Sequence, residues 1–223
     1  MNKNVENIRL QIHNTLEQML KYGYVLHNNI PKIEENNQVT RITWNNHKGG
    51  REVSSKYFLR VDQYLKIVSD NAYLAIFNDY SIIRCSFSFM ENRIISENLL
   101  WWPCPVIVDS NMVDEFGLVE TIECLLQENG TKNHILMRSP IRVDFDVKND
   151  GEFHPRSHIH MENEDCRINT SCPICFNRFI NYIIKCYYPS WRMDFEKYDY
   201  LSFQYEEQHR KIKYYNMTQL NFE

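Results

Sequence analysis

Residues 140–161 read PIRVDFDVKNDGEFHPRSHIHM, and this stretch indicates the fold more clearly than any other. Its first part, 140–147, alternates apolar and polar residues, which predicts a strand with one buried face. A turn over 148–152 leads to a second short strand around 157–161. Two strands joined by so short a connection favour antiparallel pairing, and a strand with one buried face needs a covering layer.

The rest of the chain supplies further strands and the covering helices. The segments rich in β-branched and aromatic residues are 72–77, 81–90 and 93–102, and the turn-forming pair Glu91-Asn92 between the last two predicts a hairpin. Apolar residues at helical spacing predict helices over 5–20, which ends before Gly23, and from Asp114 to about Glu128. Further expected elements are a short helix around 64–68, a helix opened by Ser171 and Pro173 and reaching Tyr187, and a polar loop over 28–56 around a short strand at 39–44.

These elements predict a single α+β domain over residues 1–223, in which helices pack on an antiparallel sheet of hairpins. Hydrophobic residues make up 43% of the chain and charged residues 24%, as in globular proteins. Residues 191–223 are aromatic and charged, and within them His209–Lys213 is the one obvious basic run, which is typical of a solvated surface. We find no internal repeat and no linker.

Charge and cysteine content restrict the function. The net charge of −4 argues against a protein that grips nucleic acid through its phosphates alone. The first residues lack the apolar run of a secretory signal, and no window approaches the ~18 apolar residues of a membrane span. Seven scattered cysteines indicate free thiols in a reducing compartment. We therefore expect a cytoplasmic protein with no membrane partner.

The densest group of chemically capable residues lies in the two strands of the opening stretch. Side chains two apart on a strand share a face, so Arg142, Asp144 and Asp146 form one row and His158 and His160 another. If the strands pair, carboxylates face imidazoles, which predicts a divalent metal site or a general acid–base pair. The alternative is that this is the polar outer face of a two-stranded edge, with Arg142 paired to an aspartate.

Other motifs carry weaker signals. Cys172-Pro173-Ile174-Cys175 is half of a zinc site or a redox pair, but buried or incidental cysteines are the more common case. The spacing of Arg41 and His47 occurs in some helical ribonucleases, whereas here β-forming residues surround it. Trp101-Trp102 fits a core better than a base-stacking platform. No Walker loop, GxGxxG, GxSxG or HExxH sequence occurs.

Several of these motifs together resemble the bacterial domain-of-unknown-function family 2290, over about residues 5–190 and in the same order. The motifs that carry the resemblance are Phe77-x-Asp79-x-Ser81, Trp102-Pro103-Cys104-Pro105, Arg142-x-Asp144, His154-Pro155-x-Ser157-His158-x-His160, Cys166-Arg167-Ile168 and the helix from Pro173 through Phe176, Phe179 and Tyr188. The family pattern does not require the cysteines that flank Pro173. The residues that match it in the candidate site are Arg142, Asp144, His154, His158, His160 and Arg167.

The resemblance implies a component of an anti-phage defence system that acts with a helicase. Our leading hypothesis is a nuclease or other phosphodiester hydrolase with nucleic acid as a partner. In this hypothesis His158 or His160 is the general acid–base, and Asp144 and Asp146 orient it or join both histidines in holding a divalent metal. Arg142 or Arg167 binds phosphate and His154 completes the catalytic set. The competing hypothesis is a non-catalytic module that docks on a helicase or another defence protein.

Overall fold

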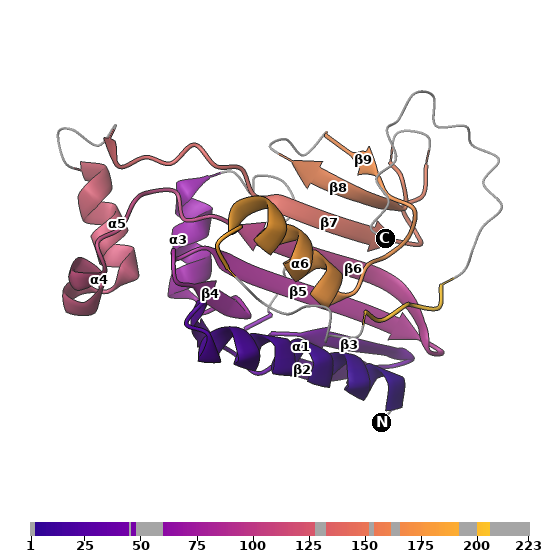
Figure 1. The fold of residues 1–223 in the computed structure, drawn as a ribbon. Coiled ribbons are helices and arrows are strands. Elements are labelled where there is room, and N and C mark those ends of the chain that lie inside the picture. Colours follow the sequence, from indigo (N-terminus) through magenta and orange to yellow (C-terminus); the bar gives the residue numbers. More distant parts are fainter. Residues whose placement is uncertain are drawn as a thin grey trace.

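The computed structural model describes residues 3–44, 46–47, 60–127, 133–151, 154–161, 166–191 and 200–205. These residues form an α+β fold, as the sequence predicts (Figure 1). The elements are α1 (Lys3–Lys21), β1 (Val25–Asn28), β2 (Lys32–Asn36), β3 (Val39–Thr43), α3 (Val61–Ser69), β4 (Ala75–Phe77), β5 (Ile82–Met90), β6 (Arg93–Trp102), α4 (Ser110–Phe116), α5 (Leu118–Gln127), β7 (Ile141–Asp146), β8 (Ser157–Met161), β9 (Ile168–Asn169) and α6 (Phe176–Tyr187).

The described strands form one antiparallel sheet. Its order is β1-β4-β5-β6-β7-β8-β9, while β3 pairs with the outer half of β5 and carries β2 on its other side. The long hairpin of β5 and β6 turns at Glu91 and Asn92, whose φ angles are 49° and 68°. Positive φ at two successive residues is what a type I′ hairpin turn requires. The hairpin predicted from the sequence is thus confirmed.

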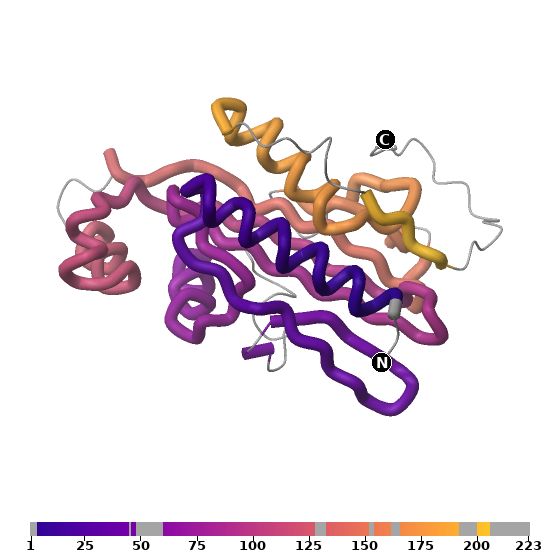
Figure 2. The backbone as a smooth tube through the Cα atoms, turned by 60° about the horizontal axis from the view of Figure 1, so that its bottom comes forward, coloured from indigo at the N-terminus to yellow at the C-terminus, as the bar shows by residue number. Residues whose placement is uncertain are grey.

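One face of the sheet is covered by α1 and α6, which lie side by side (Figures 1 and 2). The predicted terminator of α1 is confirmed, because Gly23 takes a φ of 71° two residues after the last residue of the helix. The apolar stripes of both helices pack on the central strands and form the larger core. Its members include Ile8, Ile12, Leu16, Phe87, Leu99, Val143, Phe145, Ile159, Phe176, Phe179 and Ile183.

On the opposite face of the sheet, the described helices cover one end and leave the rest of the face uncovered. Residues of α3 and α5 pack there on β4, β5 and β6 and form a second core. Its members include Tyr64, Ile67, Ile82, Leu100, Trp102, Ile122 and Leu125. Farther along this face, toward β7 and β8, the side chains that alternate with the larger core are polar. The candidate site lies on this polar part of the sheet.

Residues 110–127 form two helices, α4 and α5, whereas the sequence predicts a single helix from Asp114 to about Glu128. Glu128 itself lies outside the described residues. Gly117 separates α4 from α5 with a φ of 88°, a conformation that residues with a Cβ avoid. The N-cap of α4 is Asp109, and not the predicted Asp114; its carboxylate accepts a hydrogen bond from the Asn111 amide at 2.9 Å. Phe116, an apolar residue of the predicted helix that the sequence spacing would place on its buried face, is consequently 53% exposed.

The polar segment after β1 contains more regular structure than the sequence predicts. Residues 32–36 form β2, which pairs along its whole length with β3, and Asn37 at the turn has a φ of 55°. β2 is an outer strand with mostly exposed residues, so it lacks the apolar alternation by which a strand is recognised. The remainder of the predicted loop, 48–56, lies outside the described residues.

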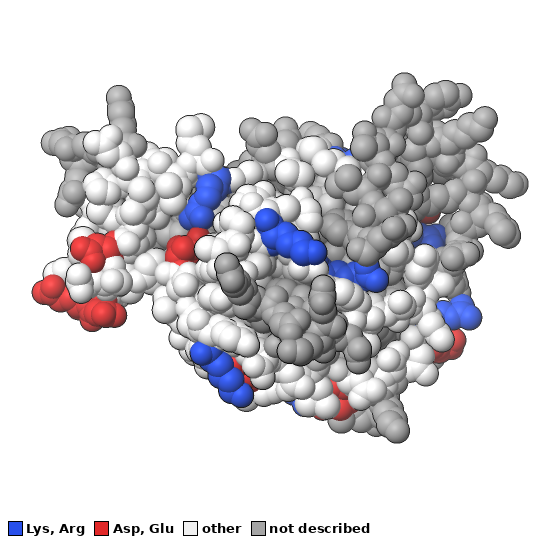
Figure 3. All heavy atoms as spheres, viewed as in Figure 1, with Lys and Arg blue, Asp and Glu red and all other residues white. Residues whose placement is uncertain are grey.

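Within the described residues no helix is long and apolar enough to cross a membrane. Figure 3 shows the face that carries α1 and α6. Described basic and acidic side chains are scattered over this face, and no broad area of one sign is visible among them.

Candidate functional site

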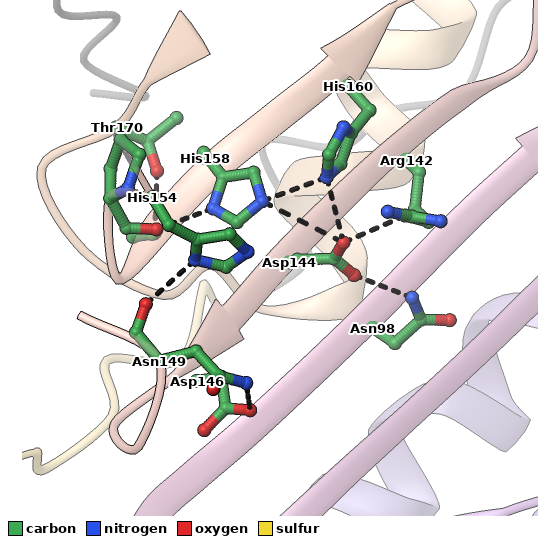
Figure 4. A network of polar contacts seen from close by, with 11 residues as sticks. Asn98, Arg142, Asp144, Asp146, Asn149, His154, His158, His160 and Thr170 are labelled. Carbon is green, nitrogen blue, oxygen red and sulfur yellow. Dashed lines mark hydrogen bonds and ion pairs between the residues drawn. The ribbon is translucent and has the colours of Figure 1, made fainter. Parts of the chain in front are cut away.

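The pairing of β7 with β8 brings the two predicted rows together. The register places Asp144 opposite His158 and Arg142 opposite His160. The residues between them, Val143 and Ile159, face the larger core, so the polar row lies on the other side of the sheet. Figure 4 shows the side chains of both strands converging there.

Three potential metal ligands meet at the centre of this arrangement, and we call Asp144, His158 and His160 the Asp/His cluster. The Nε2 atoms of the two histidines are 2.8 Å apart, and Asp144 Oδ2 lies 3.3 Å from His160 Nε2 and 3.9 Å from His158 Nε2. Among the described residues, this is the group of three whose ligand atoms all lie within 4.8 Å of one another. Ligands ~2.1 Å from a tetrahedral zinc ion are about 3.4 Å apart, so the cluster has the right dimensions.

The backbone sets the tautomer of His158. Its Nδ1 lies 2.6 Å from the carbonyl oxygen of Pro155, which can only accept a hydrogen bond. Nδ1 therefore carries the proton, and the neutral ring turns the lone pair of Nε2 toward the cluster. A histidine that donates its second N–H to a backbone carbonyl is the usual arrangement around a bound metal.

Two further side chains fix the carboxylate of Asp144. Arg142 Nε donates to Oδ2 at 2.8 Å, and Asn98 Nδ2 donates to Oδ1 at 2.6 Å (Figure 4). Asn98 lies on β6 directly opposite Asp144. The carboxylate is therefore oriented before any ligand binds, which reduces the entropy lost on binding.

The protonation states in the cluster suit metal binding. Burial lowers the pKa of His158 to about 4 and also lowers the pKa of His160, so both rings are neutral at pH 7. Burial opposes ionisation of Asp144, but the hydrogen bond from His160 and the charge of Arg142 hold the pKa of this carboxyl well below its usual range. Neutral imidazole and ionised carboxylate are the forms that bind metals.

The cluster lies in a cleft of about 510 Å³, which the other predicted site residues also line. His154 packs edge-on against His158 at 4.8 Å, and its Nδ1 lies 2.7 Å from the carbonyl oxygen of Asn149. Arg167 lines the cleft, and its charge contributes to the lowered pKa of His160. The described residues that line the cleft are Ser86, Ser96, Glu97, Asn98, Arg142, Asp144, Phe145, Asp146, Asn149, His154, His158, His160 and Arg167.

Asp146 lines the cleft but has a different local role. Its carboxylate accepts hydrogen bonds from the Lys148 amide at 2.8 Å and from Asn149 Nδ2 at 2.7 Å. These contacts shape the turn after β7, and Asp146 is not a member of the Asp/His cluster. The structure thus groups Asp144 with both histidines and places Asp146 beside them, as part of the turn that carries His154.

The weaker sequence motifs lie elsewhere. Cys175 is buried at the N-terminus of α6, and Cys172 is partly exposed. Among the described residues neither cysteine belongs to a metal-ligand group. Trp101 and Trp102 are both buried in cores, as the sequence predicts. Arg41 is on β3 and His47 follows it in a non-helical segment, so this pair lacks the helix that the ribonuclease spacing needs.

Asn98, whose amide donates to Asp144, is not among the site residues predicted from the sequence. The one signal of Asn98 in the sequence is that it is a polar residue within a strand whose C-terminal part is apolar. Ser86 and Ser96, which line the same cleft, are likewise polar residues within strands. Recognising these residues requires the strand order, because β6 and β7 are separated by 38 residues that include two helices.

A family model described as "Uncharacterized conserved protein (DUF2290)" matches residues 24–222. The chain belongs to the DUF2290 family. The resemblance predicted from the motifs is confirmed, and the matched region of this DUF2290 protein includes the whole cleft. No curated protein and no solved structure matches the chain.

Proposed function

We propose that this DUF2290 protein hydrolyses phosphodiester bonds with a divalent metal ion held by the Asp/His cluster. The convergence of Asp144 Oδ2 with the Nε2 atoms of His158 and His160 in one cleft supports the proposal most strongly. Three protein ligands that face a cleft leave coordination positions open, as in catalytic rather than structural sites. Two imidazoles and one carboxylate suit zinc, manganese or ferrous iron.

A metal ion bound here supplies Lewis acidity, which polarises a phosphoryl oxygen and lowers the pKa of a bound water. The residues of the chain supply binding and proton transfer. The guanidinium groups of Arg142 and Arg167 line the cleft and attract the phosphate, whose charge grows in the transition state.

In this proposal His154 moves a proton at the cleft. Its Nδ1 faces the carbonyl oxygen of Asn149 at 2.7 Å and therefore donates to it. In the neutral ring Nε2 then carries the lone pair that accepts a proton from an attacking water. His154 is partly exposed and packs edge-on against His158, so it is close to the metal ligands without being one of them.

The biological part of the proposal is that the nuclease acts on nucleic acid beside a helicase in anti-phage defence. The family resemblance supports this role, and the cleft is where the reaction would take place. A non-catalytic module on the same helicase remains the competing function. The two functions differ in whether the Asp/His cluster has an activity of its own.

The test uses labelled RNA and DNA, single- and double-stranded, with the purified protein and Mg²⁺, Mn²⁺ or Zn²⁺. His158→Ala removes one ligand, and His27→Ala makes the same chemical change at an exposed position of β1. We expect metal-dependent cleavage by wild type and His27→Ala, and a loss of about 100-fold or more in His158→Ala. Equal or absent cleavage in all three proteins contradicts the proposal and favours the binding module.

A further inference from the structure

A second polar site lies on the same face of the sheet, outside the cleft, around Arg84. Arg84 is in the middle of β5 and is only 3% exposed. It lies opposite Leu100, which in turn lies opposite Arg142 of the cleft. Two strand spacings separate the two arginines, which is about 10 Å between their backbones.

Arg84 is a buried cation without a counter-charge among the described residues. Its Nε and Nη1 atoms are buried and make no hydrogen bond. Burial lowers the pKa of Arg84 to about 10, a large shift for a guanidinium, and no carboxylate opposes it. Buried charges in proteins are normally paired, because an unpaired one is strongly destabilising.

Further unsatisfied donors lie on Thr43, which ends β3, and on Trp44, which follows it; β3 pairs with β5, the strand that carries Arg84. The ring of Trp44 covers the guanidinium carbon of Arg84 at 4.2 Å, a contact that attracts the cation but accepts no hydrogen bond from Nε or Nη1. Trp44 Nε1 and Thr43 Oγ1 are themselves buried without a hydrogen-bond partner, and their residues are 2% and 0% exposed. Four buried atoms that can donate hydrogen bonds therefore belong to Arg84 and to the two residues at the end of the strand paired with β5.

Charged residues of both signs lie near these residues, as their effects on the neighbouring His47 show. His47 packs edge-on against Trp44 at 4.7 Å. Burial lowers the pKa of His47, and the charges of Arg41 and Arg84 lower it further, whereas Glu34 acts in the opposite direction. The cause of the lowered pKa of Arg84 is burial. The ligand that would satisfy this group is therefore an anion that accepts several hydrogen bonds.

We propose that Arg84, Trp44 and Thr43 form a binding site for a phosphate group, separate from the Asp/His cluster. A phosphate supplies the missing negative charge and has several oxygens, each of which accepts hydrogen bonds. This inference does not depend on the proposed hydrolysis, because the orphaned donors and the buried charge belong to a different part of the sheet. The phosphate is either a free anion or the end of a phosphorylated nucleic acid, which have this chemistry in common.

The first experiment measures thermal stability and calorimetric binding with inorganic phosphate, at an ionic strength kept constant with chloride. Wild-type protein is compared with Arg84→Met and with Arg60→Met, which removes an exposed guanidinium paired with Asp62. We expect phosphate to raise the Tm of wild type and Arg60→Met by several degrees and to bind Arg84→Met at least about tenfold more weakly. No saturable binding by wild type, or an equal shift in Arg84→Met, overturns the proposal.

Thr43→Val keeps the shape of the side chain and removes one donor, so it preserves a test if Arg84→Met does not fold. We expect weaker phosphate binding with a Tm in chloride close to that of wild type. Unchanged phosphate binding in this variant contradicts the role of Thr43 Oγ1. Oligonucleotides with a 5′-phosphate or a 5′-hydroxyl group then identify the source of the phosphate. Tighter binding of the phosphorylated form assigns the site to a nucleic-acid end. Equal binding of both forms, with retained affinity for inorganic phosphate, assigns it to the free anion.

Discussion

The carboxylate of Asp144 is expected to contribute about 2 kcal/mol to the free energy of unfolding, most of which Asp144→Asn removes. Oδ2 accepts a charge-assisted hydrogen bond from Arg142 Nε at 2.8 Å, and such bonds contribute about 1.5–3 kcal/mol. The side chains are 9% and 21% exposed, so solvent screens the pair only in part. The hydrogen bond that Asn98 donates to Oδ1 survives in the variant, because an amide oxygen also accepts it.

The measurement is urea denaturation of metal-free protein in EDTA, combined in a double-mutant cycle with Arg142→Met. For a chain of this length, a loss of about 2 kcal/mol corresponds to a fall in Tm of roughly 4–8 °C. The control is Asp62→Asn, which breaks the pair between Arg60 and Asp62, where both side chains are more than 60% exposed, and is expected to change stability by less than about 0.5 kcal/mol. A coupling energy between Arg142 and Asp144 near zero, or no larger than that of the control pair, refutes the reasoning.

Three further predictions concern the stability of the fold outside the Asp/His cluster. Burial raises the pKa of Glu97 well above 4.5, so the folded protein keeps a proton that the unfolded chain releases. The contribution of this proton to stability is therefore lost as the pH rises, and the Tm of Glu97→Gln is expected to exceed that of wild type increasingly from pH 4.5 upward. Gly117→Ala forces a side chain into a φ of 88° and should lower the free energy of unfolding in urea by about 1 kcal/mol or more. Tyr188→Phe removes a buried hydroxyl that lies 3.0 Å from Asp79 Oδ2 and 3.1 Å from Ser81 Oγ, and calorimetry is expected to show a loss of about 1–3 kcal/mol. Unchanged stability in any of these variants contradicts the physical cause given for it: the proton held by Glu97, the backbone conformation of Gly117 or the hydrogen bonds of Tyr188.

Local periodicity was sufficient to predict the two rows of the site. Strand alternation depends only on the covalent geometry of the chain, so Arg142, Asp144 and Asp146 had to share a face once residues 141–146 formed a strand. The connection between β7 and β8 is short, which made their antiparallel pairing the simple expectation. The register then brought Asp144 opposite His158 without any further information.

Contacts between distant segments were not predictable in this way. Asn98 reaches Asp144 because β6 and β7 are neighbours in the sheet, and one sequence carries no signal of that order. The group of Thr43, Trp44 and Arg84 likewise depends on the pairing of β3 with β5. The division of residues 110–127 at Gly117 was missed because the helical spacing of apolar residues continues across the break.

The central claim is that Asp144, His158 and His160 hold one divalent metal ion, and elemental analysis of metal-loaded protein tests it most directly. Wild type, His158→Ala and Cys172→Ser are each incubated with Zn²⁺ or Mn²⁺, freed of loosely bound ions and analysed. We predict about one ion per chain in wild type and in Cys172→Ser, and a large loss in His158→Ala. Metal that is absent from wild type, or that His158→Ala retains in full, contradicts the claim.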